Sequence, residues 1–221
     1  MSSSSSSRGA APASASALRS PLVEALAAQI RDGLAAGKLD EDGVDRALTS
    51  PARAWVEGAC DATAATPLAD VESLVALIGA QLGGEAELAA LADQIVAGWN
   101  AKPPIPTWQR AGAALVDGPG FVASQASEWL LTAPDWSYSG GRDGFSLEVR
   151  GLATASPALR ALLGALVARL AAAASARPLD VRVHGVDGID GEALVISGRA
   201  ASPRVVDPAE ESRLHRAALA G

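Results

Sequence analysis

The chain has 221 residues, a formal charge of −7 and a hydrophobic content of 49%, while aromatic residues make up 4%. This length suits one sizeable domain or two small ones, and the abundance of alanine predicts a helix-rich core with few large side chains. The single cysteine, Cys60, excludes a disulfide framework and a multi-cysteine metal site, which favours a reducing cytoplasm. Ser20 to Asn100 carry thirteen acidic and four basic residues, and a surface of that sign repels nucleic acid.

The two ends of the chain are polar. Residues 1–19, rich in Ser, Ala and Pro, predict a disordered tail, with a cloning remnant as the alternative interpretation. This end lacks the apolar segment of a secretory signal, and no apolar run reaches the roughly 18–20 residues of a membrane span. We expect a single α+β domain at residues 20–200, with a helical part at 20–132 and a sheet part at 144–200. A C-terminal tail at 201–221 follows.

The helical part is punctuated by start and stop signals. Ser20-Pro21 predicts the start of a first helix and Gly37 its end. Thr66-Pro67 and Gly83-Gly84 bound a strongly apolar helix, and the short link after it predicts an antiparallel helical hairpin with the next one. The remaining expected elements are short helices at 40–48, from Ser50-Pro51, at 107–116 and at 119–131, a stiff proline-rich connector at 102–106 and a loop at 135–143.

The sheet part reads as a strand, a long helix and two more strands. A leucine stripe from Leu159 to Leu170 recurs at helical spacing, and Ser156-Pro157 is a typical helix start. The flanking strands, 145–151, 179–186 and 192–199, alternate apolar and polar residues, which predicts a sheet buried on one face. A helical crossover makes the first two strands parallel, so the third is expected between them and antiparallel to both.

Few residues carry the patterns of catalytic or metal chemistry. The histidines are His184, on the polar face of a predicted strand, and His215, in the predicted tail. Neither accompanies a nucleophile motif, and the glycine pairs lack the lysine of a phosphate loop. The acidic run from Asp40 to Gly43 is similar to a calcium loop but lacks its alternating ligands and final glutamate, so a charged helix start is the favoured interpretation.

Two regions could bind something. Six of the eight aromatic residues lie between Trp99 and Tyr138, where they could line an apolar pocket or simply fill the junction between helices and sheet. The polar face of the sheet is the second region. It carries mixed charges that suit either a solvated surface or a partner-docking face: Glu148, Arg150, Asp180, Arg182, His184 and Arg199.

The order of elements from Ser20 to Ala200 resembles the haem-nitric-oxide-binding-like / four-vinyl-reductase-type ligand-binding superfamily. The resemblance rests on Val71 to Leu74, on Trp136 to Arg150 and on the final hairpin. Haem-binding members share a proximal histidine on a helix and a Tyr-x-Ser-x-Arg motif before the sheet. Here Tyr138 and Arg142 keep that spacing, but the serine stands at Ser139, and Trp108 and Gln109 occupy the region where the histidine is expected. Haem needs an axial ligand, so the sequence predicts this scaffold without haem or another cofactor.

The resemblance implies a non-enzymatic sensory or adaptor module, and we expect a cytoplasmic protein that binds a small apolar or acidic ligand, a protein partner or a second copy of itself. The alternative is a purely structural interaction domain with no ligand. The residues expected to line the ligand site are Trp99, Trp108, Trp129, Tyr138 and Arg142. Tyr138 and Arg142 would orient an acidic head group.

Overall fold

Helices build the first half of the chain in the computed structural model. The structure describes residues 17–59, 65–81, 84–101, 118–132, 135–141, 144–152, 155–175, 178–188 and 191–200. In the first half it contains α1 (Ser20–Ala35), α2 (Glu41–Ala47), α3 (Ser50–Val56), α4 (Leu68–Gln81) and α5 (Glu85–Ala101). The chain leaves α1 through Gly37, which has a φ of 66°, as the sequence predicts. The connector at 102–106, the helix at 107–116 and the C-terminal tail lie outside the described residues.

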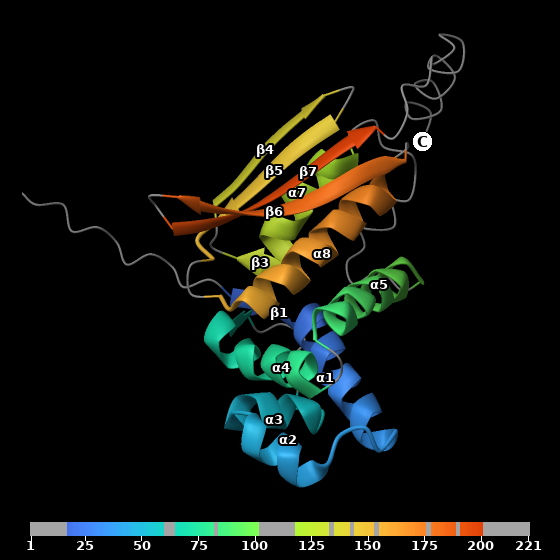
Figure 1. Cartoon of the computed structure of the whole chain (residues 1–221), viewed down its shortest axis with the longest axis vertical. Helices are drawn as coiled ribbons and strands as arrows, with labels where there is room; N and C mark the ends of the chain where they lie inside the picture. The colour runs from blue at the N-terminus through green and yellow to red at the C-terminus, as the bar shows by residue number, and fades with distance from the viewer. Residues whose placement is uncertain are drawn as a thin grey trace, which may run out of the picture.

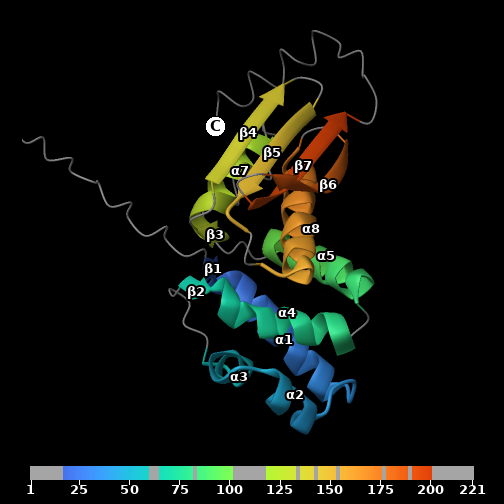
Figure 2. The same cartoon turned by 60° about the vertical axis from the view of Figure 1, so that its left-hand side comes forward.

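The second half forms a four-stranded antiparallel sheet covered by two helices. Its elements are α7 (Gly118–Trp129), β4 (Asp135–Gly141), β5 (Gly144–Arg150), α8 (Pro157–Ala174), β6 (Leu179–Gly188) and β7 (Gly191–Ala200). The strand order is β4-β5-β7-β6, so β7 lies between β5 and β6 and is antiparallel to both, as predicted. Figures 1 and 2 show α7 and α8 on one face of this sheet and the helices α1 to α5 grouped at one end of the molecule. The predicted α+β class, with a helical part packed on a small antiparallel sheet, is confirmed.

A second, smaller sheet joins the two halves. It consists of β1 (Ala17–Arg19) in the middle, β2 (Ala65–Pro67) on one side and β3 (Leu131–Thr132) on the other. This sheet was not predicted, because strands of two or three residues are too short to show an alternating pattern. Thr66-Pro67 therefore ends a strand, and α4 begins at Leu68. β1 also occupies the last three residues of the segment expected to be a disordered tail, which corrects that boundary.

The segment at 135–143 was expected to be a loop, and this prediction is wrong for its first seven residues. Asp135–Gly141 forms β4, which pairs with β5 over its full length, from Asp135 opposite Arg150 to Gly141 opposite Gly144. Trp136 and Tyr138 are half-buried on one face of β4, while Ser137 and Ser139 are exposed on the other. The aromatic–serine alternation was thus a strand pattern, although the serines and glycines are typical of a loop.

Helix α8 is the central element of the fold. It packs against both the sheet and the helices α5 and α7. Its leucine stripe is buried, and Gly164 lets the sheet approach closely, because a Cβ at this position would lie 2.6 Å from Val183 Cγ1. The buried side chains of the helical part, of α8 and of the sheet belong to one continuous hydrophobic cluster. Because α8 touches every layer, its position sets the position of the sheet relative to the helices.

Three contacts fix α8 to other elements. At its start, Ser156 Oγ accepts a hydrogen bond from Leu159 N (3.1 Å), and the Ser156 amide donates to Glu72 Oε1 of α4 (2.7 Å). Further along, Arg169 donates to both carboxylate oxygens of Asp93 on α5, with Nη2 3.1 Å from Oδ2. At its end, Gly118 of α7 lies so close that a Cβ there would overlap the carbonyl oxygen of Ala174. These contacts come from α4, α5 and α7 in turn.

By length and composition α8 could also cross a membrane, since its 18 residues have a mean hydropathy of 1.5. It is the one helix of this kind among the described residues. Ten of its residues are buried, and it packs under the sheet and beside α5 and α7. Such burial inside the protein is typical of a core helix, whose composition resembles that of a membrane span.

Candidate functional site

The structure places three of the five predicted site residues on described elements. Trp99 lies near the end of α5, where its side chain is 7% exposed and belongs to the hydrophobic cluster. Tyr138 lies on the inner face of β4 and packs, half-buried, against the same cluster. Trp129 is the last residue of α7, but its side chain, like Trp108 and Arg142 altogether, lies outside the described part of the chain. The proposed grouping of all five around one ligand therefore stays a prediction.

Around Tyr138, the inner face of the sheet carries aromatic rings over glycines. The rings of Tyr138 and Phe145 are stacked, with centroids 6.4 Å apart and an interplanar angle of 28°. Gly140 and Gly198 are the strand partners of Phe145 on its two sides. A Cβ at Gly140 would overlap the tyrosine hydroxyl, and one at Gly198 would overlap the Phe145 ring. The two glycines therefore provide the room in which the rings lie against the backbone.

Trp136 belongs to the six aromatic residues that could line a pocket, but it was not among the five expected site residues. It precedes Tyr138 by two residues and so lies on the same inner face of β4, which α7 covers. Its indole Nε1 is buried, and among the described residues no acceptor lies within hydrogen-bonding distance. A buried donor without a partner is costly, and such groups often mark a place where a ligand or water binds. The alternation of Trp136 with Ser137 and Tyr138 was the signal that could have identified it.

A shallow hollow opens at the end of the sheet beside these rings. Its volume is about 740 Å³, and its wall consists of backbone, small side chains and one charged group: Ser139, Gly140, Gly141, Gly144, Phe145, Ser146, Ser197, Gly198 and Arg199. Four of these residues are glycines, and a Cβ at Gly141 would point into open space. It is contiguous with the ring layer through Gly140 and Phe145, so the two features form one candidate site.

The outer face of the sheet carries the mixed charges that the sequence predicts. Arg150 Nε lies 2.7 Å from Glu148 Oε1, and Arg182 Nη2 lies 3.2 Å from Asp180 Oδ2. A second hollow of about 290 Å³ lies over β6 and β7, lined by Asp180, Arg182, His184, Ser197 and Arg199. His184 is exposed there, and among the described residues no three His, Cys, Asp or Glu side chains gather to hold a metal ion.

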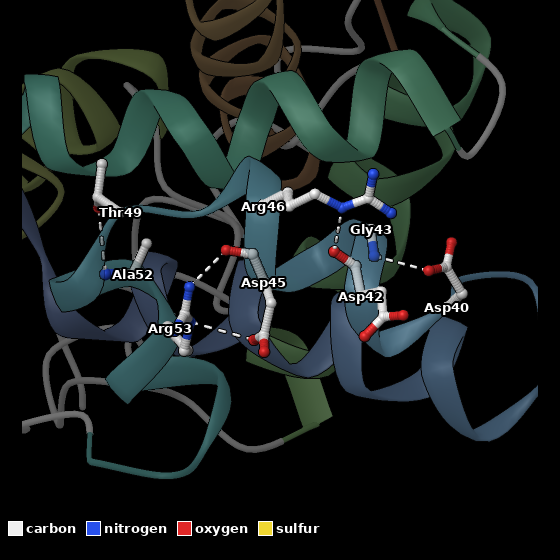
Figure 3. Close-up of polar contacts among 8 residues, drawn as sticks. All are labelled: Asp40, Asp42, Gly43, Asp45, Arg46, Thr49, Ala52 and Arg53. Carbon is white, nitrogen blue, oxygen red and sulfur yellow. Dashed lines mark hydrogen bonds and ion pairs between the residues drawn. The ribbon is translucent and has the colours of Figure 1, made fainter.

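The acidic run from Asp40 to Gly43 forms a helix start, as predicted, rather than a calcium loop (Figure 3). Asp40 is the N-cap of α2, and its Oδ1 accepts a hydrogen bond from the Gly43 amide at 2.6 Å. Arg46 Nε donates to the Asp42 carbonyl (2.9 Å), and Arg53 Nε pairs with Asp45 Oδ1 (3.1 Å). These carboxylates serve the α2–α3 corner and do not converge on a common point in Figure 3.

No protein-family model matches the sequence, and no curated protein matches it. Solved structures do resemble the fold. A mutant H-NOX protein of T. tengcongensis aligns with a TM-score of 0.54 at 12% identity, covering 85% of this chain and 100% of that one. An oxygen-binding H-NOX domain related to soluble guanylate cyclases gives 0.52 at 14% identity, with 84% and 96% covered. A third structure, which probes haem distortion in the H-NOX family, gives 0.50 at 13% identity, with the same two coverages.

This similarity shows that the chain has the fold of the H-NOX domains, so its described residues can be tested against a haem. A haem iron needs an axial ligand, and the one histidine among the described residues, His184, is exposed on the outer face of β6. Ser139 also lies on the opposite face of β4 from Tyr138, and the position that shares the tyrosine's face is Gly140. Among the described residues, therefore, no histidine lies in the helical part or on the inner face of the sheet.

Proposed function

We propose that this chain, which has the fold of the H-NOX domains, is a sensory or adaptor domain that binds a small apolar ligand with an acidic head group against β4. In this proposal it works in the cytoplasm, performs no chemistry on the ligand and passes the binding event to a partner. The fold supports a sensory role by analogy, and the residues on the inner face of β4 are the basis for the ligand.

The observation that carries the proposal is the buried indole N–H of Trp136, which has no acceptor among the described residues. A ligand oxygen placed beside it would satisfy this donor. Ligand sites are typically apolar pockets with a few donors that fix the orientation of the ligand. The inner face of β4 has this composition, because Trp136 and Tyr138 pack against the hydrophobic cluster and the Tyr138 ring stacks on Phe145.

We expect the ligand to have an acidic head group because we expect the positive charge of Arg142 near the site. Arg142 follows Tyr138 by four residues in the sequence, directly after the last residue of β4. A guanidinium at that end of β4 would pair with a carboxylate in two parallel hydrogen bonds. Trp99, Trp108 and Trp129 would complete the apolar wall of the pocket, and Tyr138 and Arg142 would hold its polar end.

Binding of an acidic amphiphile tests the proposal. Native mass spectrometry of the purified chain should reveal a co-purifying molecule, and calorimetric titration should show that decanoate binds more tightly than decanol. Trp136→Phe should weaken decanoate binding by about tenfold or more, since a hydrogen bond to a charged group contributes roughly 1.5–3 kcal/mol. Arg142→Ala should weaken it by a smaller factor, because Arg142 lies six residues further along the chain and acts on the carboxylate through its charge. Trp55→Phe is the matched control, because Trp55 is also half-buried but lies on α3.

Stability separates a binding role from a packing role. Removing the Trp136 N–H leaves no described acceptor unpaired, so Trp136→Phe should cost about 1.5 kcal/mol of unfolding free energy or less. A variant that binds weakly and remains stable supports the proposal. Equal decanoate affinity in the wild type and all three variants would contradict it.

The alternative is a structural interaction domain with no ligand. The specific observation in its favour is the filled core, in which side chains from Leu18 to Leu162 are fully buried in one cluster. In that case the purified protein would carry no small molecule, and Arg142→Ala would leave every binding measurement unchanged.

A further inference from the structure

The free edge of the large sheet is formed by β6. In the described part of the chain, β6 pairs with β7 along one side over its full length, from Leu179 opposite Ala200 to Gly188 opposite Gly191, and no strand pairs with its other side. Both views in Figures 1 and 2 show β6 at the margin of the sheet. An edge strand offers a row of backbone N–H and C=O groups to another strand.

The strand β6 carries apolar side chains on one face and charged side chains on the other. Its inner face carries Leu179, Val181 and Val183, and Val183 is 40% exposed, the one large apolar side chain with such exposure among the described residues. The outer face carries Asp180 and Arg182, which alternate in sign and form an ion pair with each other. A strand with an apolar row on one face and alternating charges on the other suits a partner with the complementary pattern.

We propose that this partner is β6 of a second copy of the chain, paired antiparallel across a two-fold axis at Val181. In an antiparallel pair centred on Val181, Asp180 lies opposite the partner's Arg182, and Arg182 lies opposite the partner's Asp180. On the inner face, Leu179 lies opposite the partner's Val183, and Val181 lies opposite its own copy. Directly opposed residues have Cβ atoms about 4.5–5.5 Å apart, so every one of these pairs is in contact.

Charge selects this register over its neighbours. An axis at Asp180 would place two aspartates opposite each other, and an axis at Arg182 would do the same with two arginines. An axis at Val183 would place Arg182 opposite the partner's His184 and leave Asp180 without a charged partner. Only registers that differ by an even number of residues keep the apolar rows of both strands on the same face of the sheet, because side chains alternate along a strand. Among these neighbouring registers, the axis at Val181 alone pairs both charges favourably.

The neighbouring strand extends the complementarity. Arg199 of β7 is the register partner of Asp180, and Ser197 is the register partner of Arg182. In the proposed dimer, Asp180 would therefore lie between its own Arg199 and the partner's Arg182. The two-fold axis generates the same arrangement a second time, so two rows of alternating charge would cross the junction of a continuous eight-stranded sheet. The hollow over β6 and β7 would border these rows.

Two charge reversals test both the dimer and its register. Arg182→Asp places aspartates opposite each other twice per dimer, and Asp180→Arg places arginines opposite each other twice. Each variant alone should raise the dimer dissociation constant by about tenfold to a hundredfold in sedimentation-velocity experiments. Mixed in equal amounts, the two variants should form a heterodimer, because every opposed pair is then attractive.

Arg150→Asp is the matched control. Arg150 also pairs with the acidic residue two positions before it, Glu148, but it lies on β5, away from the free edge. This variant should dimerise like the wild type, and circular dichroism should show all three variants folded. The proposal is overturned if the wild type sediments as a monomer at every concentration tested. It is also overturned if Arg182→Asp dimerises as well as the wild type, or if the mixture of reversed variants fails to associate.

Discussion

The cap that α4 places on α8 leads to a quantitative prediction. The Glu72 carboxylate accepts the amide hydrogen of Ser156 at 2.7 Å, although 84 residues separate the two in sequence. Such a bond, with its charged acceptor, contributes about 1.5–3 kcal/mol when well shielded, and a carboxylate at a helix N-terminus adds about 0.3–1 kcal/mol through the helix dipole. Because Glu72 is only half-buried, we expect Glu72→Ala to lower the unfolding free energy by about 1–2 kcal/mol.

Two further variants divide this contribution. Glu72→Gln keeps an oxygen acceptor and removes the charge, so it should cost about half as much as Glu72→Ala. Ser156→Ala removes the acceptor of the Leu159 amide, a cap that is typically worth about 1 kcal/mol. Urea unfolding followed by circular dichroism and tryptophan fluorescence measures all three variants. Two coincident transitions would justify the two-state treatment of the data.

An exposed glutamate supplies the control. Glu24 pairs with Arg31 on the surface of α1, and a solvated pair of this kind contributes about 0–1 kcal/mol. Glu24→Ala should therefore change stability much less than Glu72→Ala. If the two variants were equally harmless, the inter-helix cap would not stabilise the fold, and the reasoning would be refuted.

Two other predictions concern α8 and its neighbours. The Arg169 guanidinium holds the pKa of the Asp93 carboxyl below its ordinary value of 3.8, so this pair stabilises the fold above that pH and loses its effect as the pH falls through the lowered pKa. Asp93→Asn should therefore be slightly less stable than the wild type near pH 7, and urea titrations at falling pH should show the difference vanish. A constant difference would argue against the linkage. Gly118→Ala should destabilise by about 2 kcal/mol or more, because its Cβ would overlap the Ala174 carbonyl, while Gly98→Ala, in open space on α5, should stabilise by about 0.5–1 kcal/mol. If Gly118→Ala left the urea midpoint unchanged or raised it, the close approach of α7 to α8 would be contradicted.

Much of the fold was predictable because it depends on local signals. The start of α8 at Ser156-Pro157 and the end of α1 at Gly37 are consequences of capping chemistry that involves a few adjacent residues. The position of β7 between β5 and β6 was predictable because a helical crossover makes β5 and β6 parallel, and the last strand can then pair antiparallel between them. Pattern and chain geometry were sufficient in these cases.

Features that depend on distant partners were not predictable. The small sheet exists because β1 meets β2 and β3 from remote parts of the chain, and three-residue strands have no detectable period. β4 has the composition of a loop. On its inner face, the position two residues after Tyr138 is Gly140, because the Tyr138 side chain occupies the space that a Cβ would need. The importance of Trp136 for the site became visible only when its N–H was found buried without an acceptor among the described residues.

The attachment of α8 at its start, along its length and at its end has a mechanical consequence. A helix held at one point could pivot. Because α8 is held by α4, α5 and α7, a displacement at any of these contacts moves the whole helix together with the strands packed on it. β4 contacts α7, and α7 contacts α8, so a rearrangement at β4 would reach α4 and α5 through these two packed helices.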